Sequence, residues 1–121
     1  MINMMQLLFH LWGDYITQNH WMANKKVLFT KEGWIACLIH CLLYSIPFIL
    51  IASPEALAVI FGTHFLIDKF RLAKYVNQFK NWSFTPTGFP EGTPPFLAVW
   101  LLFIVDNILH VTINFLSIKY L

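Results

Sequence analysis

A histidine and an aspartate four residues apart recur three times in this chain, each time inside an apolar run. The pairs are His10/Asp14, His64/Asp68 and, in reverse order, Asp106/His110. They contain all three aspartates of the sequence. Residues i and i+4 lie on the same side of an α-helix, so each pair presents an imidazole beside a carboxylate. Because a carboxylate in apolar surroundings is costly without a partner, we expect the three pairs to meet in the folded chain.

The composition indicates a membrane protein. Of the 121 residues, 58% are hydrophobic and 12% are charged, and the mean hydropathy is +0.61. A soluble domain usually has roughly 25% charged residues. The length suits a single domain over residues 1–121. The net charge of +2 is too small to indicate a nucleic-acid partner, and membrane lipids are the expected surroundings.

Four apolar helical segments are expected, at residues 3–22, 34–52, 54–70 and 96–121. Pro47 should kink the second segment, and Ser53 followed by Pro54 should begin the third. Residues 71–80 read as a basic amphipathic stretch along the membrane interface. The loop after it contains four prolines and is expected either to cover the site as a lid or to pack through its aromatic residues. The predicted fold is an all-α, polytopic membrane four-helix bundle with a Pro/Gly-rich cytoplasmic loop between helices three and four.

The basic residues predict the orientation. Seven of the eight Lys and Arg residues fall either between the first two segments or at the end of the third and in the loop beyond it. With four spans these regions share one side, which the positive-inside rule makes cytoplasmic. The prediction is therefore a bacterial inner-membrane protein with both termini periplasmic. At about 1.5 Å of rise per residue, the three pairs and His40 then share one layer between mid-membrane and the cytoplasmic interface.

Three explanations for this layer remain open: a metal site, a proton or ion pathway, and polar contacts that only hold helices together. Metal is favoured because imidazole and carboxylate suit zinc, manganese or iron, and bundle cores build sites for one or two ions from such pairs. Asp14, Asp68 and Asp106 are candidate catalytic residues, one of which could act as a base on a metal-bound water. The expected metal ligands are His10, Asp14, His40, His64, Asp68, Asp106 and His110.

Other polar residues near this layer are candidates for hydrogen bonding to the metal ligands or for binding substrate. Gln18, Asn107 and Asn114 are expected to hydrogen-bond to the ligating side chains. Arg71 and Lys74 follow Asp68 by one or two helical turns and could bind the phosphate of a substrate. A solvated basic patch that faces the membrane is the alternative reading of these two residues.

Three stretches carry a family resemblance: LLFHLWGDYITQNHWMANKK, THFLIDKFRLAKY and PPFLAVWLLFIVDNILHVTIN. With them the chain resembles a family of small phage and bacterial inner-membrane proteins of unknown function. It is similar, more distantly, to LexA-regulated membrane-bound metal-dependent hydrolases. The first resemblance covers most of the chain through the order of its histidine and aspartate motifs. The second implies hydrolase chemistry for the same residues, with Gln18 and His40 among the positions carried over.

These observations predict an intramembrane metal-dependent hydrolase that acts on a lipid, lipid-linked or other phosphoester substrate from the cytoplasmic side. The alternative is a non-enzymatic phage or prophage membrane protein that modulates a host partner or forms an oligomeric pore. A proton-coupled carrier is a third reading, although no inverted repeat supports it. Homo-oligomerisation is left open by the sequence.

Overall fold

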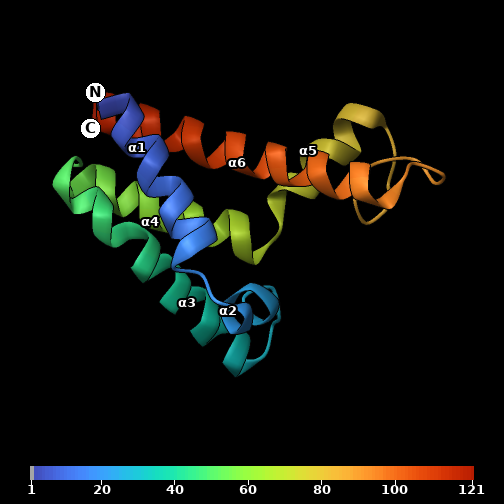
Figure 1. The fold of residues 1–121 in the computed structure, drawn as a ribbon, viewed down its shortest axis with the longest axis horizontal. Coiled ribbons are helices and arrows are strands. Elements are labelled where there is room, and N and C mark those ends of the chain that lie inside the picture. Colours follow the sequence, from blue (N-terminus) through green and yellow to red (C-terminus); the bar gives the residue numbers. More distant parts are fainter. Residues whose placement is uncertain (1) are drawn as a thin grey trace.

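The regular structure is helical throughout residues 2–121, the part of the chain that this computed structural model describes (Figure 1), which confirms the all-α prediction. The elements are α1 (Ile2–Leu11), the π-helical turn η1 (Trp12–Ile16), α2 (His20–Lys25), α3 (Lys31–Ser45), the 3-10 helix η2 (Ile46–Leu50), α4 (Pro54–Lys69), α5 (Leu72–Asn81) and α6 (Pro95–Tyr120). Helices α4 and α6 pack against each other, α3 packs against α4, and α1 packs against α6.

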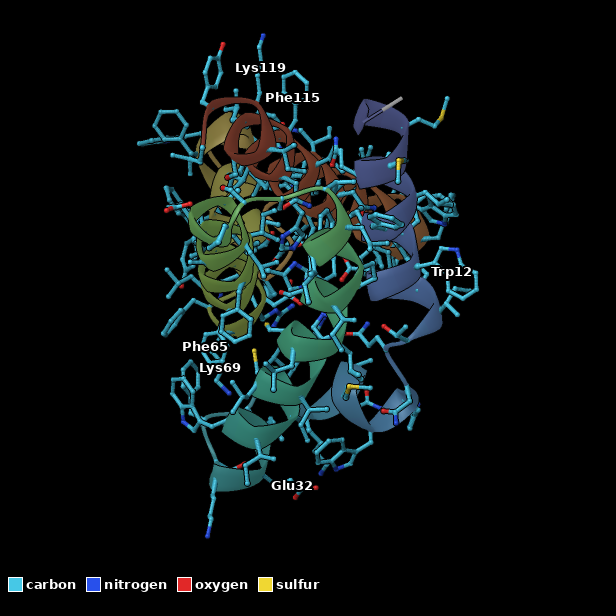
Figure 2. All side chains as sticks on the ribbon, turned by 90° about the vertical axis from the view of Figure 1, so that its left-hand side faces the viewer. Trp12, Glu32, Phe65, Lys69, Phe115 and Lys119 are labelled. Carbon is cyan, nitrogen blue, oxygen red and sulfur yellow. The ribbon has the colours of Figure 1, made fainter. Side chains whose placement is uncertain are left out.

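The two termini lie together at one end of the molecule, and α5 with its following loop lies at the other end of α6 (Figure 1). Near the termini, Tyr44, Phe48 and Ile60 form an apolar core against which Phe9 and Ile118 pack. Below this core the interior becomes polar: Figure 2 shows nitrogen and oxygen atoms gathered between the helices. The four buried histidines lie there, so the apolar core closes one end of a polar interior.

The start of α4 and the end of α3 confirm two local predictions. The Ser53 hydroxyl accepts a hydrogen bond from the backbone N–H of Ala56 at 3.1 Å, and Pro54 is the first helical residue. The α-helical part of α3 ends at Ser45 and continues as the 3-10 helix that contains Pro47, because proline cannot donate the next helical hydrogen bond. These signals fix the reversal between α3 and α4.

The expectation of one continuous helix over residues 3–22 is wrong. The α-helix stops at Leu11 and widens into a π-turn, in which the N–H of Thr17 donates to the carbonyl of Trp12 at 2.9 Å. Thr17 and Gln18 then turn their side chains back onto backbone carbonyls, Thr17 onto Gly13 at 3.0 Å. Asn19 accepts from the N–H of Met22 and begins the separate helix α2. Short polar side chains that bond the local backbone compete with helix continuation in this way.

The structure does not support four membrane-spanning helices. Among residues 2–121, two helical stretches are long and apolar enough to cross a membrane, Lys31–Leu50 and Pro95–Tyr120. Helix α1 has 10 residues and α4 has 16, fewer than the roughly 20 that a span requires. Several large apolar side chains of α6, such as Phe96 and Trp100, are exposed. These two helices are the part of the membrane prediction that the fold bears out.

The Pro/Gly-rich loop is non-helical, as predicted, and is held by α5. Three amides of α5 donate to loop carbonyls at 3.0–3.2 Å: Asn77 to Thr87, Gln78 to Thr85, and Asn81 to Gly88. Gly88 has a φ of +79° and lies so close to Asn77 that a side chain there would collide with it. The loop thus packs onto α5, and the side chains that line the charged cavity described below come from other segments.

Candidate metal centre

Four side-chain atoms from three separate elements meet inside the bundle. His40 Nε2 of α3 lies 2.9 Å from His64 Nε2 and 3.0 Å from Asp68 Oδ2, both of α4. Asp14 Oδ1 of η1 lies 3.3 Å from each of these two nitrogens, and His64 Nε2 lies 3.3 Å from Asp68 Oδ2. All four side chains are buried. This four-atom cluster could hold a metal ion.

The spacing of the four-atom cluster matches a tetrahedral ion. Zinc binds nitrogen and oxygen ligands at about 2.0–2.1 Å, which places the corners of a regular tetrahedron about 3.3–3.4 Å apart. The five separations above run from 2.9 to 3.3 Å. Two imidazoles and two carboxylates also suit iron and manganese, although manganese prefers more oxygen ligands. The geometry is compatible with each of the three expected metals and does not select one.

The hydrogen bonds around His64 leave a lone pair directed at the cluster. His110 Nε2 lies 3.0 Å from Asp68 Oδ1, so its N–H donates to that carboxylate. When His110 is neutral, its Nδ1 accepts from His64 Nδ1–H, 3.0 Å away. In that state His64 Nε2 is the unprotonated nitrogen of its ring. A histidine that binds metal through one nitrogen commonly donates the other N–H to a fixed partner, and His110 is that partner here.

Asp14 Oδ1 is the least satisfied atom of the cluster. It is buried and makes no hydrogen bond of good geometry within residues 2–121, although two histidine nitrogens lie 3.3 Å from it. A single proton on His40 Nε2 can serve one acceptor at a time, whereas a cation contacts all four atoms. Burying an acceptor without a partner is unfavourable, so the bare cluster is better suited to a cation than to protons alone.

His10 is close to the cluster but uses both ring nitrogens elsewhere. Asn107 donates its amide N–H to Tyr15 at 2.7 Å, which leaves the Asn107 oxygen to accept from His10 Nε2–H at 2.8 Å. His10 Nδ1 accepts from the Tyr44 hydroxyl at 2.6 Å. Its Nε2 lies 3.7 Å from Asp14 Oδ2, and His10 falls outside both groups of side chains that could hold an ion. In this arrangement His10 orients its neighbours.

Tyr44 was not singled out by the sequence patterns, yet it contacts most of the polar interior. Its ring stacks on His64 with centroids 3.6 Å apart and planes 16° apart. Its hydroxyl accepts from the amide of Asn114 at 2.8 Å and donates to His10. The signal that could have found it is position: Tyr44 lies one turn after His40 on the same face of α3.

The remaining predicted residues divide by location. Asp106 Oδ2 lies 3.4 Å from His110 Nε2, and its side chain is 30% exposed. Asp14, Asp106 and His110 form a second group that could hold an ion. Gln18 lies further out and donates to the backbone carbonyl of Asp14 at 3.2 Å. The three His/Asp pairs therefore converge, with Asp106 at the edge of the buried region.

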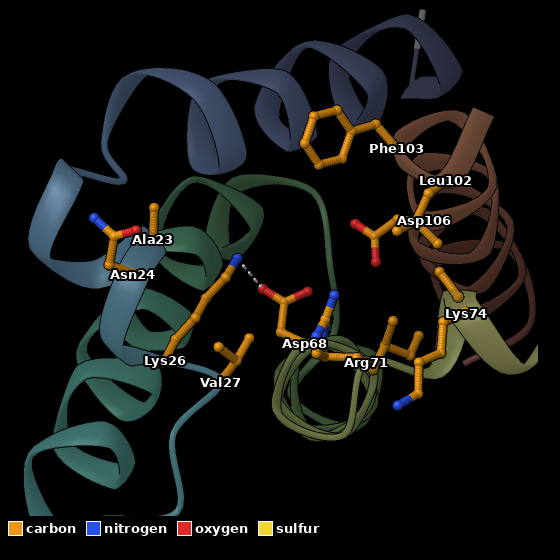
Figure 3. Close-up of a pocket in the computed structure, with 12 residues that line it drawn as sticks. Ala23, Asn24, Lys26, Val27, Asp68, Arg71, Lys74, Leu102, Phe103 and Asp106 are labelled. Carbon is orange, nitrogen blue, oxygen red and sulfur yellow. Dashed lines mark hydrogen bonds and ion pairs between the residues drawn. The ribbon is translucent and has the colours of Figure 1, made fainter. Parts of the chain in front are cut away.

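A cavity of about 360 Å³ is lined by Asp68 of the four-atom cluster and by Asp106. Figure 3 shows its lining residues converging from α2, from the junction of α4 with α5, and from α6. Arg71 and Lys74, the predicted anion-binding residues, both line it. We call this space the charged cavity. A cation bound at the four-atom cluster would add positive charge at its wall, which favours an anionic occupant.

Lys26 also lines the charged cavity and was not among the predicted site residues. Its Nζ donates to Asp68 Oδ2 at 2.8 Å, as the dashed line in Figure 3 marks. Burial alone would lower the pKa of the Lys26 ammonium, but the Asp68 carboxylate outweighs burial and raises that pKa above its ordinary value. Lys26 therefore stays charged beside the cluster. The sequence showed Lys26 to be one of the basic residues between the first two segments. It did not indicate the ion pair with Asp68, which is 42 positions away.

Gly13 provides a test of how closely η1 must approach α3. A methyl group at position 13 would overlap the ring of Tyr44, so Gly13→Ala should displace either Tyr44 or Asp14. We expect the melting temperature to fall by about 5–10 °C, corresponding to about 1–3 kcal/mol of overpacking. Gly62→Ala, on α4 with open space around its Cα, is the matched control and should melt near the wild type. Equal melting of the two variants would contradict the close approach.

No curated protein and no solved structure matches the chain. One family model does, and it covers residues 2–120, which is nearly the whole length. It therefore includes all three His/Asp pairs and His40. The chain belongs to the family described as protein of unknown function DUF3307.

Proposed function

We propose that this protein is a metal-dependent hydrolase that acts in a membrane on a lipid, lipid-linked or other phosphoester substrate. The observation that supports it most is the four-atom cluster, whose spacing suits a divalent ion and which opens at Asp68 into the charged cavity. The two carboxylates and two imidazoles carry the ion, and the basic residues of the cavity receive an anion. In a phosphoester hydrolase of this kind, the ion would activate water and the basic residues would hold the phosphate.

Asp14, His40, His64 and Asp68 would hold a divalent ion, which would supply hydroxide from water near neutral pH. In the proposed hydrolysis a water oxygen would form a bond to phosphorus while the bond from phosphorus to the leaving oxygen breaks, and the leaving oxygen would take a proton. Asp106, partly exposed at the charged cavity, accepts the proton from water and returns it to the leaving group. Arg71 and Lys74 hold the non-bridging phosphate oxygens.

The membrane setting belongs to the same proposal. The exposed apolar side chains of α6 and the second candidate span, Lys31–Leu50, support it. We further propose a bacterial inner-membrane location with both termini periplasmic, on the distribution of basic residues. In such a setting α1 and α4, too short to span alone, would contribute to the buried interior against α6 and α3.

The test combines metal analysis with hydrolysis by the purified full-length protein in detergent. We expect about one zinc, iron or manganese ion per chain, and release of nitrophenol from a chromogenic phosphoester. Asp106→Asn should keep the ion and lower kcat by about 100- to 10,000-fold. Glu55→Gln makes the same chemical change at an exposed position. It should leave both the metal content and kcat unchanged.

A protein without stoichiometric metal, or with equal turnover in Asp106→Asn and wild type, would contradict the hydrolase. That outcome would favour the non-enzymatic alternative, a phage or prophage membrane protein that acts on a host partner or forms a pore.

A further inference from the structure

A second and larger space lies along a neighbouring face of α6. It has a volume of about 740 Å³ and runs between the end of α1 with η1 and the first half of α6. Its walls are apolar, and they include Leu11, Phe96, Val99, Trp100 and Ile104. We call it the apolar groove. Its size is within the usual range for small-molecule sites.

The apolar groove offers few hydrogen-bonding groups. Tyr15 and Asn107 are its two hydrogen-bonding side chains, and the amide of Asn107 donates to the hydroxyl of Tyr15 at 2.7 Å. The oxygen of Asn107 is used by His10. An occupant with several polar groups would therefore lose most of its hydrogen bonds to water without replacement, which is unfavourable. A hydrocarbon chain meets no such penalty.

The apolar groove and the charged cavity meet at one side chain. Phe103 lines both spaces, and in Figure 3 it stands at the edge of the charged cavity toward α1. On one side of it lies Asp106, and on the other lie Val99 and Ile104. One molecule with an anionic head and an apolar chain can therefore reach across Phe103 into both. Neither space alone predicts such a ligand.

We propose that the apolar groove binds the hydrocarbon chain of a membrane phospholipid whose phosphate occupies the charged cavity. This rests on the proposed function and narrows it, because it selects a chain-bearing phosphoester over a soluble one. Lipid is chosen over a second protein chain for two reasons. The groove shares the side chain of Phe103 with a cavity whose Lys26, Arg71 and Lys74 suit phosphate, and it lies along α6, a candidate membrane span.

The test compares two chromogenic substrates that share a head group, nitrophenyl butyl phosphate and nitrophenyl dodecyl phosphate, with the full-length protein in detergent. Each buried methylene should raise kcat/KM about fourfold, so wild type should strongly prefer the longer ester. Ile104→Trp, which fills the groove, should lower the ratio of dodecyl to butyl kcat/KM by about tenfold or more. Ile108→Trp, one turn further along α6 and exposed, should keep the ratio of the wild type.

A binding measurement makes the test independent of turnover. Dodecyl phosphate with a photoreactive group near the end of its chain should label residues of the apolar groove, and Ile104→Trp should reduce that labelling while Ile108→Trp should not. Labelling confined to the exposed face of α3, or an unchanged ratio in Ile104→Trp, would overturn the proposal.

Two patterns separate failure of the groove from failure of the proposed reaction. Hydrolysis of both esters without chain preference would keep the hydrolase and reject the lipid groove. Labelling of the groove without hydrolysis of either ester would keep the lipid site and reject the hydrolase. Absence of labelling together with a dimer whose crosslinks join two α6 helices would reject lipid in favour of a second copy of the chain.

Discussion

Asp68→Asn should weaken zinc binding by at least about 100-fold and abolish measurable phosphoester hydrolysis. Asp68 Oδ2 is one of the four cluster atoms, and an amide oxygen lacks the charge that balances a divalent ion. The same change alters the acceptor of His110 Nε2–H and the partner of Lys26. Equilibrium dialysis with zinc, followed by metal analysis, measures the affinity, and nitrophenol release measures the activity.

A matched control separates the site from general damage. Glu91→Gln changes a carboxylate to an amide on the exposed loop, away from the cluster, and should bind zinc as tightly as wild type. The amide oxygen of Asp68→Asn can accept from His110, but the NH2 group then replaces the oxygen that accepts from Lys26. Circular dichroism therefore establishes that the variant is folded before zinc binding is measured. Wild-type zinc affinity in a folded Asp68→Asn protein would show that the cluster is not the metal site.

Removal of metal should lower the melting temperature by about 10 °C or more. A ligand at 1,000 times its Kd stabilises the folded state by about 4 kcal/mol, and each kcal/mol moves the midpoint by several degrees in a chain of this size. Without an ion, two carboxylates and two imidazoles face each other at 2.9–3.3 Å. Thermal melts before and after chelation, followed by re-addition of zinc, measure the effect.

If the four-atom cluster binds the ion, a variant of the cluster should lose the effect of chelation on the melting temperature. In Asp14→Asn, chelation should change the melting temperature by no more than about 2 °C, because the ion is already weakly held. Calcium, which prefers six to eight oxygen ligands, should not restore the wild type after chelation. A melting temperature that chelation leaves unchanged in the wild type would contradict a structural role for metal.

Much of the candidate site followed from spacing alone. A repeated i, i+4 pair in apolar surroundings predicts that polar side chains share a face and seek partners, and His64 with Asp68 do so in the structure. His40 belongs to no His/Asp pair and was predicted from its expected depth in the membrane. It contributes one of the four atoms of the cluster. Such predictions work because a buried charged group is unfavourable unless it contacts a polar or oppositely charged partner.

Other features depend on contacts between distant segments and could not be predicted from one sequence. The π-turn η1 places Asp14 beside His40 and His64, and it depends on Gly13 lying against Tyr44 of another helix. Lys26 finds Asp68 only once α2 folds back along α3. Hydropathy counted apolar residues but not the break at positions 12–19, so the first segment was expected to be one long helix, whereas two helical stretches elsewhere are long and apolar enough to cross a membrane.

The side-by-side position of the two chain ends has a practical consequence. Both ends lie away from α5 and its loop (Figure 1), and the charged cavity lies between α2, the α4–α5 junction and α6. An affinity tag or fluorescent reporter can therefore be fused at either end without crowding the cavity. Two such fusions, one at each end, should report the same cellular compartment, so a single pair of strains can establish the sidedness of the protein in living cells.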